Sequence, residues 1–348
     1  MSGPIEPSPE PGAPTVDWLI PAPTGELVVE PHLAAIEAQA VEADRTRSLD
    51  PDMVEGLRGS EVMRLSADAS LGGRAASVSD IGRELEAVAA RCASTAWCLW
   101  NHLAVFHLFA GALGPDHGDR LRDIITAGRW VSFPAGAGSG VRATVDGDRA
   151  VLDGVAAFGT GARYGDHCGV VFAVVGPDGE VVRDADGPDL RFTVIDNTVD
   201  GMAIKPTWDG SGLRASATDD VAYRGVEVDL AACTRWFGAN RAESLRTVPV
   251  IDHRYREDWV GLSDLWLGWM AVGVVRECLR FAAETIGGRR VIMGARMVGR
   301  STVQINLGQA LARCLSARAA VTEACAEVDR RIEAGIVPDQ ADYFRQQA

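Results

Sequence analysis

The stretch Gly159-Thr160-Gly161 joins two apolar runs within residues 156–175, AAFGTGARYGDHCGVVFAVV. A Gly-x-Gly sequence after a strand often begins a nucleotide-binding loop, because glycine lets backbone N–H groups approach a ligand closely. A dinucleotide fingerprint also requires a helix after the glycines, with its N-terminus facing the pyrophosphate. Here a second strand follows instead, and Gly165 misses the spacing Gly-x-Gly-x-x-Gly. The stretch is therefore not a Rossmann loop, which leaves another kind of binding loop or a plain hairpin connection.

Histidines and one aspartate are the other candidates for acid–base chemistry. His102 and His107 lie five residues apart in an apolar segment, so on a helix they point in different directions and one of them could face a site. His167 follows the glycine stretch, and Asp264 follows Ser263 in a later apolar segment. The alternatives are structural. His102 and His107 could be core histidines with satisfied hydrogen bonds, preferred for His107; His167 could merely turn to solvent; and Asp264 could be solvated or capping, which is preferred.

The cysteines argue against a metal site. There are seven of them, an odd number, and no Cys-x-x-Cys pair occurs. A disulfide framework or a zinc site would require regular pairs. We therefore predict free thiols, a reducing cytoplasm and no metal.

Composition excludes several classes of partner. The net charge of −14 argues against nonspecific binding to nucleic acid or to an anionic membrane, since both require a basic field. No apolar run reaches the roughly 18 residues that cross a bilayer. The N-terminus has neither a basic start nor an apolar stretch, so we expect no secretion signal. A soluble cytoplasmic protein with a small-molecule substrate is the resulting expectation.

The hydrophobic period changes twice along the 348 residues. A Pro-rich tail over residues 1–25, which we expect to be disordered, precedes helical patterns over 26–128. Within these, Asp50 is the expected N-cap of a short helix, and Ser79 and Asp80 precede a long buried helical segment. Short β-rich runs with Asp-Gly turns fill residues 129–240, and no helical pattern separates them, which predicts an antiparallel sheet or barrel. Residues 241–348 return to helix, with Ser301 as a plausible N-cap. The chain is therefore predicted to be an α+β protein.

Motifs in this order resemble those of the acyl-CoA dehydrogenase superfamily of flavoproteins, most of all its branch of two-component flavin-dependent monooxygenases. The resemblance covers about residues 30–348, and the order and spacing of the motifs are more specific than any one of them. It implies an N-terminal helical domain, a middle antiparallel β domain and a C-terminal helical bundle. The motifs are LRGSEVMRLSADASLGGRAAS, STAWCLWNHLAVF, GVAAFGTGARYGDHCGVVFAV, PTWDGSGLRASATDDVAYRGVEV and GARMVGRSTVQINLGQALARCLSARAAV.

The resemblance implies that the Thr-Gly loop approaches a flavin ring, whose N1/N5 region changes charge on reduction. Backbone N–H groups and a hydroxyl on a tight turn would stabilise that charge. On this basis we expect flavin contacts from Phe158, Thr160 and Gly161, with Phe133, Ala135 and Ser139 as the other wall. Trp208 is expected near the ring, or else as a packed aromatic side chain.

A phosphate grip is also implied. Arg290-x-x-Met293-Gly294 resembles the family's Arg-x-x-Phe-Gly, which contacts the cofactor's phosphates from a neighbouring subunit. Methionine replaces the aromatic residue, and the connection to Gln304 is longer than in the family. Arg290 and Gln304 are therefore candidate phosphate contacts, and Arg290 could instead be a surface arginine.

Two reactions compete. An acyl-CoA dehydrogenase requires a carboxylate base, but VGLSDLWLGWMAVG offers only Asp264, and the family's usual C-terminal position lies beyond Ala348. A monooxygenase requires a dry pocket and a nearby donor or base. His102 lies near the position where this branch carries a pocket histidine. The candidate catalytic residues are thus His102, Thr160 and Asp264.

The resemblance stops before the last one or two bundle helices of the family. A shortened member, a subunit completed by another chain, or an incomplete sequence would explain this, and an incomplete bundle favours oligomers. The leading hypothesis is an oxygenase component that takes reduced FAD or FMN from a separate reductase, as a homotetramer or a heteromer with a homologous chain. The alternatives are an acyl-CoA dehydrogenase and a non-catalytic subunit of a heteromeric flavoenzyme.

Overall fold

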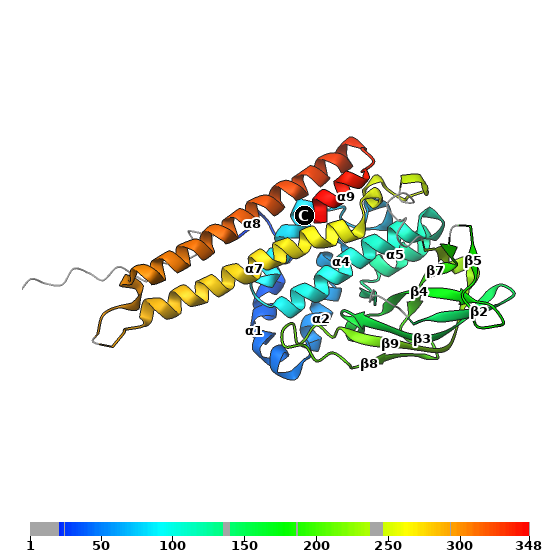
Figure 1. Ribbon diagram of the computed structural model, residues 1–348, viewed down its shortest axis with the longest axis horizontal. Helices are drawn as coiled ribbons and strands as arrows, with labels where there is room; N and C mark the ends of the chain where they lie inside the picture. The colour runs from blue at the N-terminus through cyan, green and yellow to red at the C-terminus, as the bar shows by residue number, and fades with distance from the viewer. Residues whose placement is uncertain are drawn as a thin grey trace, which may run out of the picture.

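The computed structural model describes residues 21–23, 25–134, 140–185, 187–236, 246–292 and 294–347. Helices precede and follow a β-sheet, as Figure 1 shows, so the predicted α+β order is confirmed. The N-terminal helices pack together with two long C-terminal helices on one side of the sheet. The N-terminal helices are α1 (Glu30–Thr46), α2 (Pro51–Arg58), α3 (Val78–Ala89), α4 (Ala93–Leu113) and α5 (Gly118–Thr126), with 3-10 turns at Glu61–Arg64, Ala69–Leu71 and Pro115–His117.

Local signals set several helix starts. Asp50 caps α2 as predicted, its side chain accepting from the Met53 N–H at 2.9 Å. The cap of α3 is Ser77 rather than Ser79, because Ser77 Oγ accepts from the Asp80 N–H, whereas Ser79 bonds to Asp329. The apolar segment after it forms two helices, since Cys92 is extended and separates α3 from α4.

Helix α4 is apolar on all sides because the protein surrounds it. Among the described residues it is the one helix long and apolar enough to cross a membrane, yet 89% of its apolar window is buried inside the protein. Its side chains contribute to both large core clusters, one shared with α3 and α7 and one with β1 and β7. Core packing therefore accounts for its composition.

The middle of the chain forms a sheet with the strand order β10-β7-β4-β2-β3-β9-β8, and β1 pairs with β4 at its side. A separate ribbon pairs β5 with β6. The strands are β1 (Val131–Ser132), β2 (Arg142–Asp146), β3 (Arg149–Gly159), β4 (His167–Val175), β5 (Arg183–Asp184), β6 (Gly187–Pro188), β7 (Leu190–Asp196), β8 (Met202–Lys205), β9 (Asp219–Asp229) and β10 (Thr234–Arg235), with 3-10 turns at Ala162–Tyr164 and Leu230–Ala232.

The sheet is mixed, which corrects the purely antiparallel prediction. Strand β4 runs parallel to both β1 and β2, while the other pairings in this sheet are antiparallel. Strand β2 lies between β3 and β4 in the sheet. After β3 the chain therefore crosses over β2, and β4 pairs on the far side of β2. Turn residues between strands predict a reversal of direction, but they do not say which strand becomes the neighbour.

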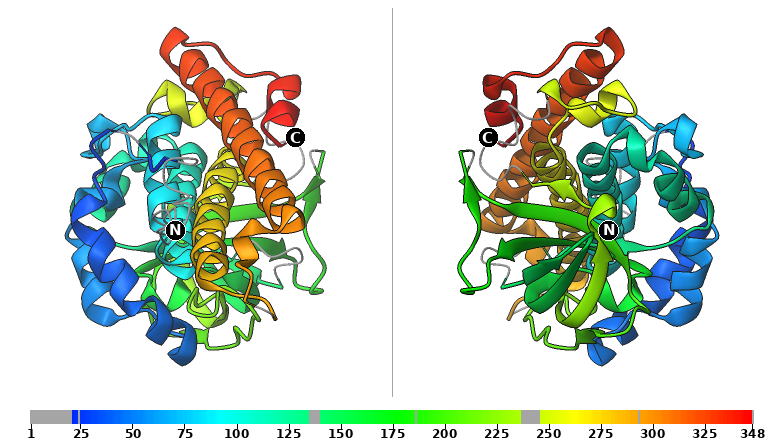
Figure 2. Two further views of the ribbon diagram at one scale, coloured as in Figure 1. Left: turned by 90° about the vertical axis from the view of Figure 1, so that its left-hand side faces the viewer. Right: turned by 90° about the vertical axis from the view of Figure 1, so that its right-hand side faces the viewer.

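The C-terminal part is dominated by two long antiparallel helices, α7 (Trp259–Gly288) and α8 (Ser301–Ala334), after a 3-10 turn at His253–Arg256 and joined through another at Met297–Gly299. Their far ends project beyond the rest of the molecule in Figure 1, while the short helix α9 (Gln340–Gln347) returns to the start of α7. Figure 2 shows the hairpin lying beside the N-terminal helices and not across the outer face of the sheet. The first half of α7 packs on α3 and α4.

Candidate functional site

The Thr-Gly stretch forms a tight turn at the end of β3. Phe158 has a left-handed φ of 65° at an irregularity in the pairing with β9, and Gly161 has a φ of 70°. The Gly161 N–H donates to the Ser216 carbonyl at 2.9 Å, and Thr160 is 5% exposed. Because β3 and β4 are not neighbours, this turn is not the hairpin connection that the sequence left open. A strained non-glycine residue at such a position often marks a functional turn.

A chain of hydroxyls links this turn to helix α4. Trp97 Nε1 donates to Thr160 Oγ1 at 3.1 Å, and Thr160 Oγ1 lies 3.2 Å from Thr218 Oγ1. Ser216 Oγ lies 2.8 Å from the same Thr218 hydroxyl. The turn, β9 and α4 therefore meet at Thr160. Sequence reasoning did not single out Trp97, Ser216 or Thr218, although each lies in one of the motifs that carry the family resemblance, because nothing local shows that their side chains meet at Thr160.

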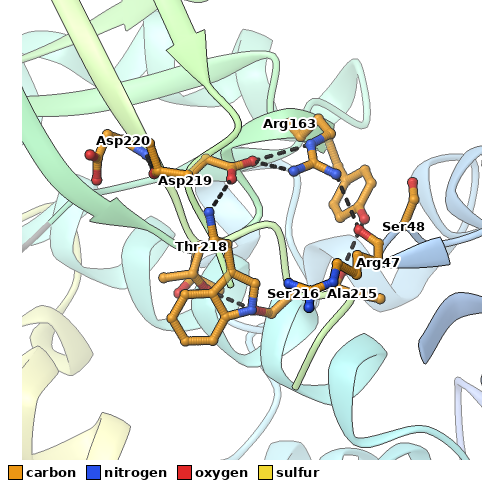
Figure 3. A network of polar contacts seen from close by, with 12 residues as sticks. Arg47, Ser48, Arg163, Ala215, Ser216, Thr218, Asp219 and Asp220 are labelled. Carbon is orange, nitrogen blue, oxygen red and sulfur yellow. Dashed lines mark hydrogen bonds and ion pairs between the residues drawn. The ribbon is translucent and has the colours of Figure 1, made fainter. Parts of the chain in front are cut away.

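Asp219 is the centre of a network of polar contacts next to the Thr160 turn, as Figure 3 shows. Its buried carboxylate accepts from Arg163 at 2.9 and 3.1 Å, and its other oxygen accepts from the Trp208 N–H at 3.1 Å. Arg163 also donates to the Arg47 carbonyl at 3.1 Å. Because Arg163 follows the Thr160 turn directly, Asp219 ties that turn to the segment that carries Trp208.

Trp208 is linked to the turn through Asp219, while its position near a flavin ring stays a prediction. Its indole N–H donates to the Leu213 carbonyl at 2.9 Å, so its own loop orients the ring. Leu213 and Ala217 in this loop both have left-handed φ values, 51° and 45°. Such values are costly for side chains other than glycine, which shows that surrounding contacts hold the loop in place.

Aromatic side chains pack in two neighbouring groups, one around α4 and one around Phe133. The rings of Trp97 and Trp100 are 4.7 Å apart, and Trp100 Nε1 donates to the Ser263 carbonyl at 3.1 Å. Phe133, 4% exposed, packs 6.1 Å from Trp259 and also contacts Phe192 and Trp236. The next residue, Pro134, lies against Gly159, where a Cβ would be 3.5 Å from the proline ring. Phe133 is therefore part of the core beside β7, and the residue after it contacts the turn.

His102 is enclosed by the backbone. Nδ1 accepts from the Val131 N–H at 3.1 Å, so Nε2 carries the proton and donates to the Met63 carbonyl at 2.9 Å. Complete burial lowers the pKa of this histidine to about 4, which keeps it neutral. With both ring nitrogens occupied, His102 holds β1 against α4, and this geometry favours a positioning role over the predicted catalytic one.

The remaining titratable candidates lie apart from the Thr160 turn. His107 is buried, and its Nε2 bonds to the Glu257 carbonyl at 2.9 Å, the structural role preferred for it. His167 has a pKa lowered by burial, and it begins β4 opposite Asp196. Asp264 is exposed on α7, where desolvation and then the charge of Asp258 raise its pKa. Among the described residues, no three His, Cys, Asp or Glu side chains form a group that could hold a metal ion.

The predicted phosphate contacts lie at the tip of the α7–α8 hairpin. Arg290 donates to the Gly294 carbonyl at 3.0 Å, and Gln304 donates to the Val298 carbonyl at 3.1 Å. The hairpin tip projects away from the sheet in Figure 1, so one chain does not bring these residues to Thr160. Ala135 and Ser139 lie outside the described residues.

Comparison of the whole chain with known proteins identifies solved structures of the same fold. No family model and no curated protein matches the chain. Among solved structures, XiaF from Streptomyces sp., in complex with FADH2 and glycerol, superposes with a TM-score of 0.79 at 18% identity, covering 91% of this chain and 78% of that one. FMN-bound TdsC from Paenibacillus sp. A11-2, a dibenzothiophene monooxygenase, gives 0.79 at 16% identity over 92% and 80%. The methanesulfinate monooxygenase MsuC from Pseudomonas fluorescens gives 0.76 at 16% identity over 92% and 79%.

Identities this low establish the fold, while the activity has to be argued from the site. This chain aligns with each of these three structures over about nine-tenths of its length. The chain therefore has the acyl-CoA dehydrogenase-like fold that these solved structures share.

Proposed function

We propose that this chain is the oxygenase component of a two-component monooxygenase, which uses reduced FAD or FMN from a separate reductase to hydroxylate or N-oxygenate a small organic substrate. The observation that carries the proposal is the Thr160 turn, hydrogen-bonded to Trp97 of α4 in a fold whose solved examples hold FMN or FADH2. The flavin would supply the activation of oxygen, chemistry that no protein side chain performs alone.

The residues of the turn suit a flat, redox-active ring. Phe158 is 61% exposed at the end of β3 and offers an aromatic face. Thr160, with its hydroxyl, follows two residues later in the sequence. A Cβ at Gly159 would lie 3.1 Å from the Asp219 carbonyl, so the backbone is closely packed there, and Gly161 has a left-handed φ of 70° that favours glycine. We assign Phe158, Thr160, Gly161 and Trp208 to the flavin side of the site and Phe133 to the substrate side. The aromatic side chains of Trp97, Trp100 and Trp259 would exclude water.

The carboxylates of the described residues favour an oxygenase over a dehydrogenase. Removal of a substrate α-proton requires a base that faces the flavin, and Asp264 is exposed. The buried glutamates are occupied: Glu84 caps the backbone at Val28 and Val29, Glu86 pairs with Arg276 and Arg318, and Glu257 pairs with Arg331. An acyl-CoA dehydrogenase is therefore the second candidate.

The assembly and compartment belong to the same proposal. Phe281, Ile292 and Ile305 are exposed on the projecting hairpin, which suits burial against further subunits in a homotetramer or a heteromer. Contact of Arg290 and Gln304 with a flavin phosphate would then come from a neighbouring subunit. All seven cysteines are free thiols, which suits a reducing cytoplasm.

Equilibrium binding of FAD and FMN, each in the oxidised and the anaerobically reduced form, tests the function. We expect a marked preference for a reduced flavin, followed by oxygen-dependent reoxidation. Tight binding of oxidised FAD, with turnover of an acyl-CoA in the presence of an electron-accepting dye, would replace the proposal by the dehydrogenase. Binding of neither form would favour the non-catalytic subunit, for which co-purification with a homologous chain is the decisive measurement.

A further inference from the structure

Asn101 has a buried amide oxygen without a hydrogen bond. The residue lies in the middle of α4 and is 7% exposed, and within the described part of the chain its Oδ1 has no hydrogen-bond partner. A buried polar atom without a partner costs free energy, and native proteins carry few of them. Asparagine also has a low helix propensity, so its presence here is not explained by the stability of α4.

Other buried polar side chains of the same helix all serve the fold. The Ser94 hydroxyl accepts from the Ala215 N–H at 3.3 Å, and Thr95 Oγ1 accepts from Gln39 at 3.2 Å. His102 and His107 both bond to backbone groups. Asn101 is therefore the exception on a helix that otherwise satisfies its buried polar atoms.

The position of Asn101 connects it with the proposed site. Residues four apart share a helix face, so Asn101 lies one turn from Trp97, whose indole bonds to Thr160. The preceding residue, Trp100, donates to the Ser263 carbonyl on α7. The Ser263 hydroxyl is also buried, 4% exposed, and has no partner in the described residues. Two buried oxygens without partners, Asn101 Oδ1 and Ser263 Oγ, thus lie on the two packed helices α4 and α7.

We propose that Asn101, assisted by the Ser263 hydroxyl, binds the planar amide edge of a ligand, in which an N–H lies next to a C=O. A carboxamide offers a donor and an acceptor side by side and forms two parallel hydrogen bonds with such an edge. The inference rests on the proposed function and names the chemistry that its site recognises. The edge belongs either to the pyrimidine ring of the flavin or to a lactam-like group of the substrate.

Asn101→Leu tests this, because leucine has a similar size and removes both polar ends. The probes are reduced FMN and FAD, and separately 2-quinolone and naphthalene, two fused ring systems of which only the first carries a lactam edge. We expect the wild-type protein to prefer 2-quinolone and Asn101→Leu to lose about tenfold or more in affinity for either the reduced flavin or 2-quinolone, with naphthalene unaffected. The thermal midpoint of the variant should stay the same or rise, because it loses an unsatisfied group.

Ser66→Ala is the matched control. The Ser66 hydroxyl is equally buried, 2% exposed, and has no partner in the described residues, but it lines a cavity of about 130 Å³ with Arg254 and Asp329. This control should keep the affinity for all probes. Ser263→Ala gives a second variant, with a smaller loss for the same ligand as Asn101→Leu.

The flavin and 2-quinolone titrations distinguish the two possible ligands of Asn101. Weaker flavin binding assigns the edge to the flavin, and retained flavin binding with a lost preference for 2-quinolone assigns it to the substrate. Unchanged affinity for both, or a fall in thermal midpoint without any change in binding, overturns the inference. If the wild-type protein binds no flavin, the proposed function fails, whereas a 2-quinolone preference that disappears in Asn101→Leu would still support the amide-binding site.

Discussion

Asn101 and His102 are neighbours with opposite environments. One helical step turns them about 100° apart, so the histidine faces β1 and the Met63 carbonyl while the amide lies on the face of Trp97. A histidine is the more familiar catalytic residue, yet here its two nitrogens are used by the backbone. At the scale of single residues, the number of satisfied hydrogen bonds separates positioning groups from those that remain available to a ligand.

The pKa of His102 predicts how stability depends on pH. Because this pKa falls from 6.5 to about 4 in the folded protein, the unfolded chain binds a proton that the folded chain does not between these values. The contribution to stability is therefore complete above pH 6.5 and is lost as the pH falls toward 4, by about 3 kcal/mol at most. Denaturant titrations at several pH values should give a steeper slope for the wild-type protein than for His102→Gln. Equal slopes would contradict the assignment.

We predict that the Thr160→Val variant binds reduced flavin more weakly. The variant keeps the shape of the side chain but removes the acceptor of the Trp97 indole and the bond to Thr218. A lost neutral hydrogen bond is worth about 1 kcal/mol, so we expect roughly a fivefold to tenfold weaker Kd for reduced flavin. Fluorescence titration measures it, and Thr198→Val, at an exposed hydroxyl bonded to Asp196, is the control. Identical affinities for both variants would place the site elsewhere.

At the scale of elements, the site depends on how β3 and β9 end. Gly159 pairs with Asp219 after an irregularity in register, and this directs the Thr160 turn toward α4. The carboxylate that stabilises the arrangement comes from the first residue of β9, and the guanidinium comes from the 3-10 turn after β3. The geometry of the turn is thus a property of two strands together.

Asp219→Asn should loosen both elements. The variant is nearly isosteric but removes the charge that accepts from Arg163 inside the protein, and we expect a loss of about 2–3 kcal/mol in the free energy of unfolding. Reduced-flavin affinity should fall as well, because the Trp208 segment loses its anchor. Arg149→Gln breaks the exposed pair with Glu227 and should change neither quantity measurably. A stability loss of the same size in both variants would show that burial of the pair does not matter.

At the scale of the whole molecule, a buried ion pair closes the chain upon itself. Glu257, before α7, accepts from Arg331 of α8 at 2.9 and 3.1 Å and from Gln346 of α9 at 2.7 Å. The carbonyl of the same glutamate bonds to His107 of α4. The first turns of α7, which carry Ser263, are therefore positioned by segments from both ends of the sequence.

Arg331→Met should be strongly destabilising. It leaves the carboxylate of Glu257, 1% exposed, without its cation, and breaking a buried pair in this way typically costs about 3–5 kcal/mol. Arg330→Met, at the adjacent residue with exposed partners Glu323 and Glu327, should have no measurable effect. Denaturant unfolding measures both variants. If the two behave alike, the Glu257 pair does not hold the C-terminal helices in place.

Much of this architecture is local in origin. The Asp50 cap and the order of helices, strands and helices follow from residue types within a few positions of one another, because dihedral preference and hydrophobic period act over that range. The family resemblance adds the fold, which the solved structures confirm. These parts were predictable from the residues alone.

Only the tertiary structure decided which groups are free to act. The parallel pairing of β4 with β2, the backbone partners of His102, the burial of Asp219 beside Arg163 and the absence of a partner for Asn101 Oδ1 within the described residues all depend on segments that lie far apart in the sequence. Burial fixes the strength of a charge or a hydrogen bond, and burial is set by which elements pack together, so no local pattern contains it. The sequence by itself determined the order of helices, strands and helices and the residue types of the Thr-Gly stretch, and packing determined the geometry of the Thr160 turn and the chemistry around it.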